Sequence, residues 1–255
     1  MTVTYQDVVT ANRALAAWAL VEASGLDFAP YIGGTHLTGT GVFDYQQAGP
    51  FAASFGLGAH LTAKLALAFV ATVIAPVTNE VWIKLPSATP AAAQTVFYAG
   101  NGGANGSGVT VATNGHIHIL EGGVADTDTG LLWPDAAWHL LQVSVSQLGA
   151  VSTLAIDGLV RFRRVLATSN APVPNTTFYF GDSGFGSGNV CQIAMPAFYA
   201  YELTPTQMNA SYLAATDPAS AINLTITGGA GTPASSLALL NKLIEYVAKT
   251  FQNAP

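Results

Sequence analysis

The chain has 255 residues, of which 50% are hydrophobic, so it can bury a sizeable core in one large domain or in one domain with a small appendage. Only 9% of the residues are charged, and the formal net charge is −6. The eight Lys and Arg residues are scattered except for Arg161, Arg163 and Arg164, and they form no basic stripe for a phosphate backbone. This distribution excludes nucleic acid as an expected partner.

The single cysteine, Cys191, leaves no internal disulfide and no cysteine-based zinc site to expect. The N-terminal MTVTYQDVV lacks the basic and apolar regions of a secretion signal, which predicts no Sec-type export. The most apolar run, residues 65–77, is too short to cross a bilayer as a helix and contains Pro76. We interpret it as buried strand and expect no membrane partner.

The predicted elements begin with a helix over residues 5–20, followed between residues 25 and 58 by short strands and turns rich in glycine and proline. Strands then dominate, each five or six residues long: Glu80–Leu85, Thr95–Ala99, Gly108–Ala112, His116–Leu120, Leu140–Val145 and Val151–Ile156. Clusters of turn residues separate them. Many short strands at this spacing predict two packed antiparallel sheets.

The later elements have stronger local signals. Asp157 and Gly158 suit the two positive-φ positions of a type I′ turn, which predicts a β-hairpin over residues 152–162. Two more strands are expected at residues 177–180 and 192–200. Thr204, Pro205 and Gln207 then form an N-cap, a first helical position and a capping box, which predict a helix over residues 204–215.

Five segments occur in an order that carries a resemblance. They are YQDVVTANRALAAWALVEASG, EVWIKLP, AAWHLLQVSV, AIDGLV and FYFGDSGFGSGNVCQIAMPAFYAYELTPTQMNASYL. Over about residues 5–215 the chain resembles the bacterial and phage laminin-G-like domains of the concanavalin A-like lectin/glucanase family. The resemblance implies a mainly β fold: an antiparallel jelly-roll β-sandwich with short flanking helices over residues 1–218.

The EVWIKLP strand presents two different faces. Because strand residues alternate between faces, Val81, Ile83 and Leu85 are expected in the core. Trp82 then shares the opposite face with Glu80 and Lys84. We favour a packed Trp82 on a covered face over a ligand platform.

No catalytic constellation is evident, and we predict that the protein is not an enzyme. Glucanases of this fold place paired carboxylates on one strand, and this chain lacks that motif. Its only acidic pair two residues apart is Asp126 and Asp128, in a Gly- and Thr-rich segment interpreted as a loop. This pair binds calcium or is simply solvated, and we favour solvation. The GDSG segment at residues 181–184 has no histidine base in a protease-like motif.

Histidines and aromatic residues supply further candidates. His116 and His118 project from one face of a strand and would share a metal if a third ligand lay nearby. No cofactor is required, and calcium at Asp126 and Asp128 is the one ion considered. If the protein binds sugars, exposed aromatic residues on loops would stack on the sugar faces: Tyr31, Tyr45, Trp133 and Phe185.

The tail is predicted as a separate unit. Residues 219–235 form a flexible linker, and residues 236–255 form an amphipathic helix. Its seam of about two heptads consists of Leu237, Leu240, Ile244, Val247 and Phe251. An isolated helix of this length needs its seam covered, either by its own sandwich or by other chains. We favour an assembly or anchoring role.

These features favour a non-catalytic structural or adhesion protein of a bacteriophage virion, as a capsid-decorating or tail component. Its expected partners are other virion proteins or copies of itself, and in addition a cell-surface glycan. The alternative is a carbohydrate-binding, lectin-like module of a bacterial surface or secreted protein, located outside the cell. A glycoside hydrolase is disfavoured because the paired carboxylates are missing.

Overall fold

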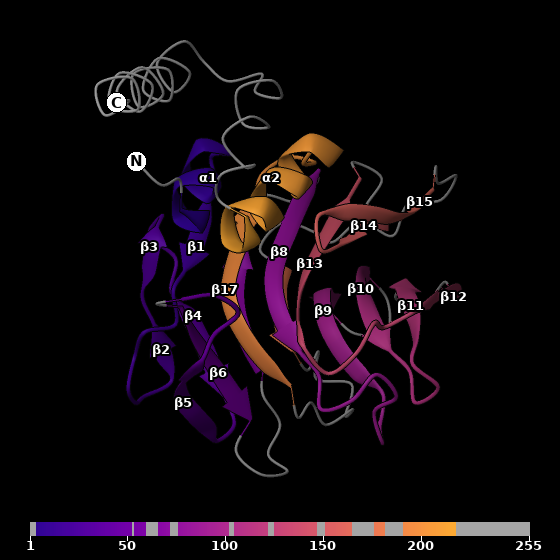
Figure 1. The fold of residues 1–255 in the computed structure, drawn as a ribbon, viewed down its shortest axis with the longest axis horizontal. Helices are drawn as coiled ribbons and strands as arrows, with labels where there is room; N and C mark the ends of the chain where they lie inside the picture. The colour runs from indigo at the N-terminus through magenta and orange to yellow at the C-terminus, as the bar shows by residue number, and fades with distance from the viewer. Residues whose placement is uncertain are drawn as a thin grey trace, which may run out of the picture.

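The computed structural model describes residues 4–52, 54–59, 66–71, 76–101, 105–121, 125–146, 151–164, 176–181 and 191–217. Its strands form two sheets that pack face to face, and neighbouring strands run antiparallel (Figure 1). The predicted antiparallel β-sandwich is confirmed.

Sheet A has nine strands and sheet B has eight. In order across sheet A they are β15 (Leu159–Arg163), β14 (Val151–Ile156), β13 (Trp138–Val145), β8 (Val77–Lys84), β17 (Gln192–Tyr199), β1 (Ala16–Trp18) and β3 (Pro30–Ile32), with β6 (Phe55–Ala59) also paired to β17 and β5 (Phe43–Ala48) paired to β6. Across sheet B they are β12 (Ala125–Leu132), β11 (His116–Glu121), β10 (Asn105–Val111), β9 (Gln94–Asn101), β16 (Thr176–Gly181), β7 (Ala66–Ala71), β4 (Leu37–Thr40) and β2 (Asp27–Phe28).

The main core lies between the sheets and is rich in aromatic rings. Phe178 of sheet B and Phe198 of sheet A meet edge to face with ring centroids 5.0 Å apart. Phe69 of sheet B lies 5.1 Å from Trp18 of sheet A. These side chains are buried, and such ring pairs add to the hydrophobic stabilisation of the sandwich.

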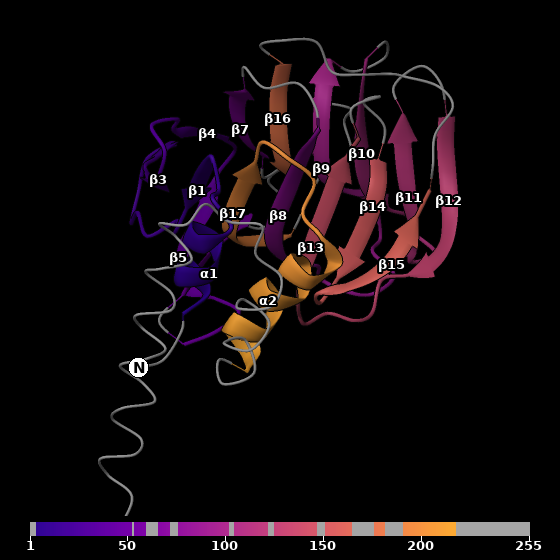
Figure 2. The ribbon, with the colours of Figure 1, turned by 90° about the horizontal axis from the view of Figure 1, so that it is seen from above.

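A second apolar layer lies on the outer face of sheet A. Val81 and Ile83 belong to the main core, whereas Trp82 belongs to a separate cluster with Tyr5 of α1 (Tyr5–Ala11) and Met208 of α2 (Pro205–Thr216). Both helices lie on the sheet A side of the sandwich (Figure 2). We call the outer face of sheet A the covered face, and the outer face of sheet B the open face. The predicted burial of Trp82 on a covered face is confirmed.

The helix α2 begins as predicted. Thr204 caps the helix, because its hydroxyl oxygen accepts a hydrogen bond from the backbone N–H of Gln207 at 3.3 Å. Pro205 occupies the first turn. In contrast, the predicted helix over residues 5–20 is wrong beyond Ala11. Arg13 has φ 55°, a left-handed conformation that ends the helix, and residues 16 and 17 pair with β17 instead. Neither α1 nor α2 is long and apolar enough to cross a bilayer.

Two hairpins test the predictions for a turn and for a loop. Asp157 and Gly158 have φ values of 54° and 72°, which confirms the positive-φ turn between β14 and β15. The segment containing Asp126 and Asp128, predicted as a loop, is the edge strand β12. Its alternating Asp and Thr residues have strand periodicity, and threonine is a favoured strand residue.

Candidate functional site

Glu80 lies buried near the centre of the covered face. Its Oε1 accepts hydrogen bonds from the hydroxyl groups of Tyr5 at 2.6 Å and Tyr199 at 3.4 Å, and its Oε2 accepts one from the Gln142 side-chain amide at 2.6 Å. The same Gln142 nitrogen donates to the Met208 carbonyl of α2 at 3.0 Å. Glu80 therefore connects the central strands of sheet A to both helices.

The protonation of this group follows from its burial. Burial raises the pKa of Glu80 above its ordinary 4.5, although the hydrogen bonds from Tyr5 and Gln142 act in the opposite direction. Burial, followed by the negative potential of Glu80, raises the pKa values of Tyr5 and Tyr199 well above 10.0. Both tyrosine hydroxyls therefore stay protonated and act as hydrogen-bond donors at neutral pH.

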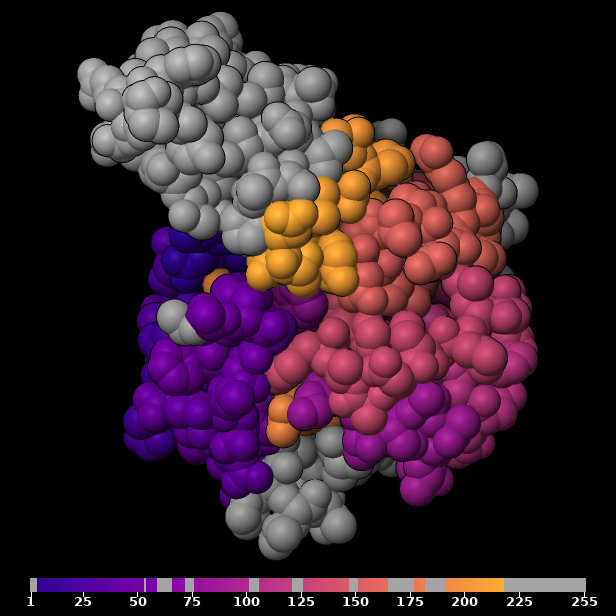
Figure 3. Space-filling view, viewed as in Figure 1, coloured from indigo at the N-terminus to yellow at the C-terminus, as the bar shows by residue number. Residues whose placement is uncertain are grey.

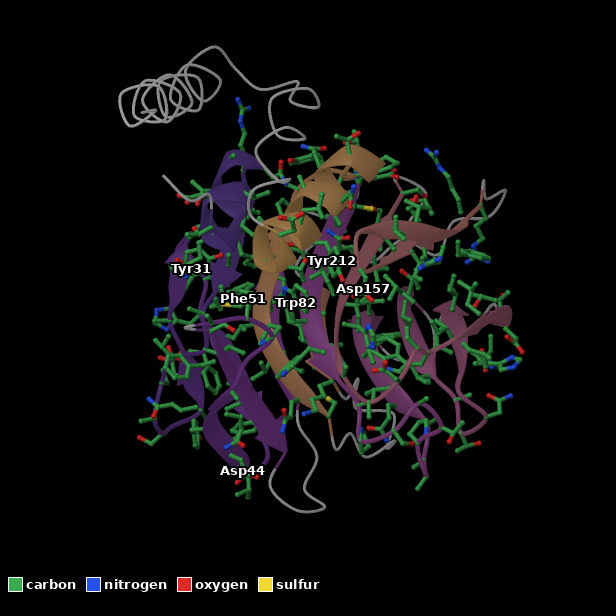
Figure 4. The ribbon with its side chains drawn as sticks, in the orientation of Figure 1. Tyr31, Asp44, Phe51, Trp82, Asp157 and Tyr212 are labelled. Atoms are coloured by element: carbon green, nitrogen blue, oxygen red, sulfur yellow. The ribbon has the colours of Figure 1, made fainter. Side chains whose placement is uncertain are left out.

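Aromatic rings close the covered face around Glu80. Trp82 lies between Phe51 and Tyr212, with ring centroids 6.1 Å and 6.0 Å away (Figure 4). Helix α2 lies across the upper part of the same face (Figure 3). Trp82 is 2% exposed and Glu80 is 0% exposed, so neither group meets solvent.

The covered face lacks the groups for glycoside hydrolysis. Within the described part of the chain, Glu80 is the only buried acidic residue, whereas hydrolysis of this kind uses two carboxyl groups that face each other. Its hydrogen-bond partners occupy both carboxyl oxygens. This arrangement holds the helices on the sheet.

The open face is organised differently. The strand registers align one residue from each of seven neighbouring strands in a row: Asp126, Leu120, Gly108, Tyr98, Tyr179, Ala68 and Thr38. We call these residues the tyrosine row. The neighbouring Phe97, Phe178 and Phe180 face the main core, so Tyr98 and Tyr179 face outward.

Small residues flank the two tyrosines. A Cβ atom at Gly108 would lie 2.6 Å from Cδ2 of Tyr98, which shows that the Tyr98 ring covers this glycine. Ala68 occupies the position beyond Tyr179. Tyr98 is buried and Tyr179 is half-buried, so Tyr179 offers the more accessible ring.

Two histidine–aspartate pairs lie at the β11–β12 end of the row. Nδ1 of His116 is 2.8 Å from Asp128, and Nδ1 of His118 is 2.8 Å from Asp126. The Gly130 backbone amide and His116 lower the pKa of Asp128, which is therefore ionised at neutral pH. Since Asp128 holds Nδ1 of His116, Nε2 of His116 is left to a ligand or to water. Nε2 of His118, in contrast, is buried and has no hydrogen-bond partner within the described residues.

The structure thus unites four of the sequence-predicted residues. The predicted partners were different, because the histidines were considered for a metal and the aspartates for calcium. Within the described residues, no group of three or more His, Cys, Asp or Glu side chains is placed to hold a metal ion. Calcium binding stays a prediction from the sequence.

The predicted aromatic residues do not form a common site. Trp133 was expected to be exposed on a loop, and this expectation is wrong: Trp133 is 1% exposed, and its ring packs edge to face against His139 at 5.5 Å. Tyr31 is 36% exposed on the edge strand β3, and the half-buried Tyr45 donates its hydroxyl hydrogen to the Gly25 carbonyl. Trp133 and Tyr31 lie near opposite edges of the sandwich.

The remaining predicted residues lie outside the described part of the chain: Phe185, Leu237, Leu240, Ile244, Val247 and Phe251. Sequence reasoning also missed Tyr98 and Tyr179. In VFYAG and TTFYFG, each tyrosine follows a phenylalanine. Once the phenylalanines are assigned to the core, alternation places the tyrosines on the outer face.

Comparison with protein families gives one match. The model of the concanavalin A-like lectin/glucanases superfamily matches residues 57–209, which is more than half of the chain. The comparison with curated proteins gave no match.

Solved structures share the fold at low sequence identity. A Trypanosoma rangeli sialidase in complex with 2,3-difluoro-KDN matches with a TM-score of 0.61 and 12% identity, over 80% of this chain and 32% of that one. The binding domain of botulinum neurotoxin DC in complex with rat synaptotagmin II matches with a TM-score of 0.59 and 10% identity, over 79% of this chain and 51% of that one. This chain therefore spans between a third and a half of those proteins.

Proposed function

Because the chain belongs to the concanavalin A-like lectin/glucanases superfamily, we propose that it is a non-catalytic binding protein that holds its ligand on the open face of sheet B. The observation that carries this proposal is the outward-facing, half-buried Tyr179, which lies beside the buried Tyr98 near the centre of the tyrosine row. Among the described residues, helices and aromatic rings fill the covered face, so they leave no room there for the ligand that we place on the open face.

The chemistry of the open face supports a glycan as the ligand. A sugar offers apolar ring faces and many hydroxyl groups, and aromatic rings beside polar side chains are the usual complement in binding sites. Tyr179 supplies a half-buried ring. The two His–Asp pairs and Thr38 supply donors and acceptors along the same face. Two solved structures with this fold are a sialidase in complex with sialic acid and a neurotoxin binding domain, which is consistent with a binding role.

The burial of Glu80 and Tyr5 supports a non-catalytic role. Sialidases use a tyrosine nucleophile, and Tyr5 and Glu80 are hydrogen-bonded at 2.6 Å. However, Tyr5 is 1% exposed, and its raised pKa keeps the hydroxyl protonated. A nucleophile that neither meets substrate nor loses its proton does not start the reaction.

The setting we propose is a bacteriophage virion, in which the protein decorates the capsid or forms part of the tail. The alternative setting is the bacterial surface. The support is the low content of charged residues and the resemblance of the five segments. Mass spectrometry of purified particles from a bacterium that carries the gene would detect the chain, and its absence from such particles would favour the alternative.

The binding surface is tested with a glycan array, followed by affinity electrophoresis on any glycan that is retained. We expect Tyr179→Ala to weaken retention by roughly tenfold or more, because one stacked ring contributes on the order of 1 kcal/mol or more. Tyr31→Ala is the matched control, since it removes an exposed tyrosine from the edge of sheet A. If the array shows no retention, or if only Tyr31→Ala reduces it, the proposed site is wrong.

A further inference from the structure

One side of the sandwich carries the last strand of each sheet, as far as the described residues define the sheets. Strand β15 is the edge of sheet A, and β12 is the edge of sheet B. Both lie at the same side of the molecule, away from β2 and β3 (Figure 2). We call this side, formed by β12 and β15, the charged edge.

The two strands carry opposite charges. Strand β15 and the residue after it hold Arg161, Arg163 and Arg164, which are three of the eight basic residues of the chain. Arg161 and Arg163 are exposed and make no ion pair within the described residues. The nearby Glu202 carboxylate instead accepts a hydrogen bond from Ser152 at 2.8 Å.

Strand β12 provides the acidic counterpart. The Asp126 and Asp128 side chains are 63% and 44% exposed. Each carboxylate is hydrogen-bonded to a histidine ring nitrogen at 2.8 Å. The charged edge therefore has a basic strip on sheet A and an acidic strip on sheet B.

The same side carries two exposed leucines. Leu132 at the end of β12 is 61% exposed, and Leu159 at the start of β15 is 50% exposed. Both lie at the same end of the sandwich, because His139 contacts Trp133, which follows Leu132, and Asp157, which precedes Leu159 by two residues. The arginines and aspartates lie further along both strands, toward the opposite end.

We propose that a second copy of this chain docks on the charged edge, with a two-fold axis parallel to the strands, so that β15 of each copy lies beside β12 of the other. A rotation about this axis exchanges the two sheets but keeps the position of each residue along the strands. Leu159 of one copy then meets Leu132 of the other, and Arg161 and Arg163 meet Asp126 and Asp128.

The charge pattern selects this axis over the other edge-to-edge arrangement. A two-fold axis perpendicular to the sheets would place β12 beside β12 and β15 beside β15, so like charges would face each other. Such contacts are repulsive and suppress the wrong docking geometry. In the proposed arrangement the basic strip of each copy meets the acidic strip of the other, so both symmetry-related contacts join opposite charges.

The size of the surface predicts a weak dimer. Strand β12 has eight residues, which corresponds to a length of about 26 Å, and packed sheets lie about 10 Å apart. With side chains included, the charged edge offers roughly 500 Å² per copy, or about 1,000 Å² in total, which is the lower limit for a specific interface. We expect a dissociation constant in the range of about 1 to 100 µM.

The test is a charge-reversal experiment on the full chain, using sedimentation velocity and native mass spectrometry. The variants are R161D/R163D and D126R/D128R. We expect each variant alone to raise the dimer dissociation constant about tenfold or more, because each converts both contacts into repulsion. An equimolar mixture of the two variants restores opposite charges at both contacts, and we expect it to form the heterodimer selectively.

The matched control is Asp27→Arg. Asp27 lies on β2, the opposite edge of sheet B, and is paired with His36 at 2.8 Å just as Asp126 is paired with His118. This variant should dimerise like the wild type. The proposal is overturned if the wild type stays monomeric at a concentration about ten times the upper end of the expected dissociation constant, if the charge reversals leave the assembly unchanged, or if the mixed variants do not associate.

Discussion

The outer faces of the two sheets carry similar side chains but differ in whether helices cover them. The central strand β8 of sheet A presents the buried Thr78, Glu80 and Trp82 outward, and the central strand β16 of sheet B presents the half-buried Thr177 and Tyr179. On sheet A two helices cover this mixture, and Glu80 accepts hydrogen bonds from Tyr5 and Gln142 within the protein. On sheet B the described residues place no helix over the strands (Figure 2). The comparison teaches that a strand's composition does not determine whether its outer face becomes core, because the cover comes from elsewhere in the chain.

The largest expected effect tests the covered face as core. Trp82→Ala should lower the free energy of unfolding by about 3 to 5 kcal/mol, because it removes a buried ring between Phe51 and Tyr212 and leaves a cavity. Urea denaturation measures the change. Val70→Ala on the open face, where Val70 is 52% exposed, is the control and should change the value by less than about 0.5 kcal/mol.

The next effect concerns the buried carboxyl group. Glu80→Ala should cost about 2 to 4 kcal/mol, since it leaves the Tyr5 hydroxyl and the Gln142 amide buried without their acceptor. Asp126→Ala removes a carboxyl group that is 63% exposed, and should have little effect on stability. Equal losses in the two variants would contradict the distinction between the faces.

The same carboxyl group predicts a pH dependence. Because burial raises the folded-state pKa of Glu80 above 4.5, the folded protein holds this proton more tightly than the unfolded chain. Its contribution to stability is therefore complete below pH 4.5 and is lost as the pH rises through the folded-state pKa. Glu80→Gln cannot titrate, so the stability of the wild type relative to this variant should fall with rising pH. A difference that is constant from pH 4 to 8 would argue against the raised pKa.

A smaller effect tests how the Tyr98 ring packs on Gly108 in the tyrosine row. In Gly108→Ala the new Cβ would lie 2.5 Å from the Phe97 carbonyl oxygen and 2.6 Å from the Tyr98 ring. We expect a loss of about 1 to 3 kcal/mol and a displaced Tyr98 ring. Thermal unfolding measures the first effect, and tyrosine fluorescence or NMR of the ring measures the second. A neutral substitution would mean that the Tyr98 ring moves aside at no cost.

The smallest expected effect on stability is at Tyr179, the residue that we assign to ligand binding on the open face. Tyr179→Ala should change stability by less than about 1 kcal/mol, because Tyr179 is only half-buried on the open face. A variant that unfolds at the wild-type temperature but loses glycan retention separates binding from folding. A large loss of stability would instead place Tyr179 among the packing residues.

Local signals predicted much of the fold. Strand alternation assigned Val81 and Ile83 to the core and Trp82 to the other face, and the turn and capping residues located the β14–β15 hairpin and α2. Each of these predictions depends on neighbours in the sequence. The helix expected over residues 5–20 was wrong beyond Ala11 because pairing with β17, at least 180 residues later, overrides local propensity.

The candidate site was less predictable for the same reason. His116, His118, Asp126 and Asp128 were each identified, but their pairing depends on the β11–β12 register. Trp133 was assigned to an exposed loop because its burial depends on the main core between the sheets, which is built from residues distant in the sequence. Tyr98 and Tyr179 become neighbours only through the pairing of β9 with β16, which brings together segments about 80 residues apart.

The hydrogen bond between Tyr5 and Glu80 has a consequence for how the chain folds. Tyr5 also lies 3.4 Å from the carbonyl oxygen of Met195, a contact between residues 190 positions apart. During synthesis, Tyr5 can reach Glu80 and Trp82 early, but its contact with Met195 has to wait until the last strand has been made. Part of the sheet surface that receives the first helix therefore stays uncovered for most of the translation time. Contacts that close such long loops form late and slowly. Chaperones are expected to recognise this nascent surface, which disappears when the two ends of the domain meet.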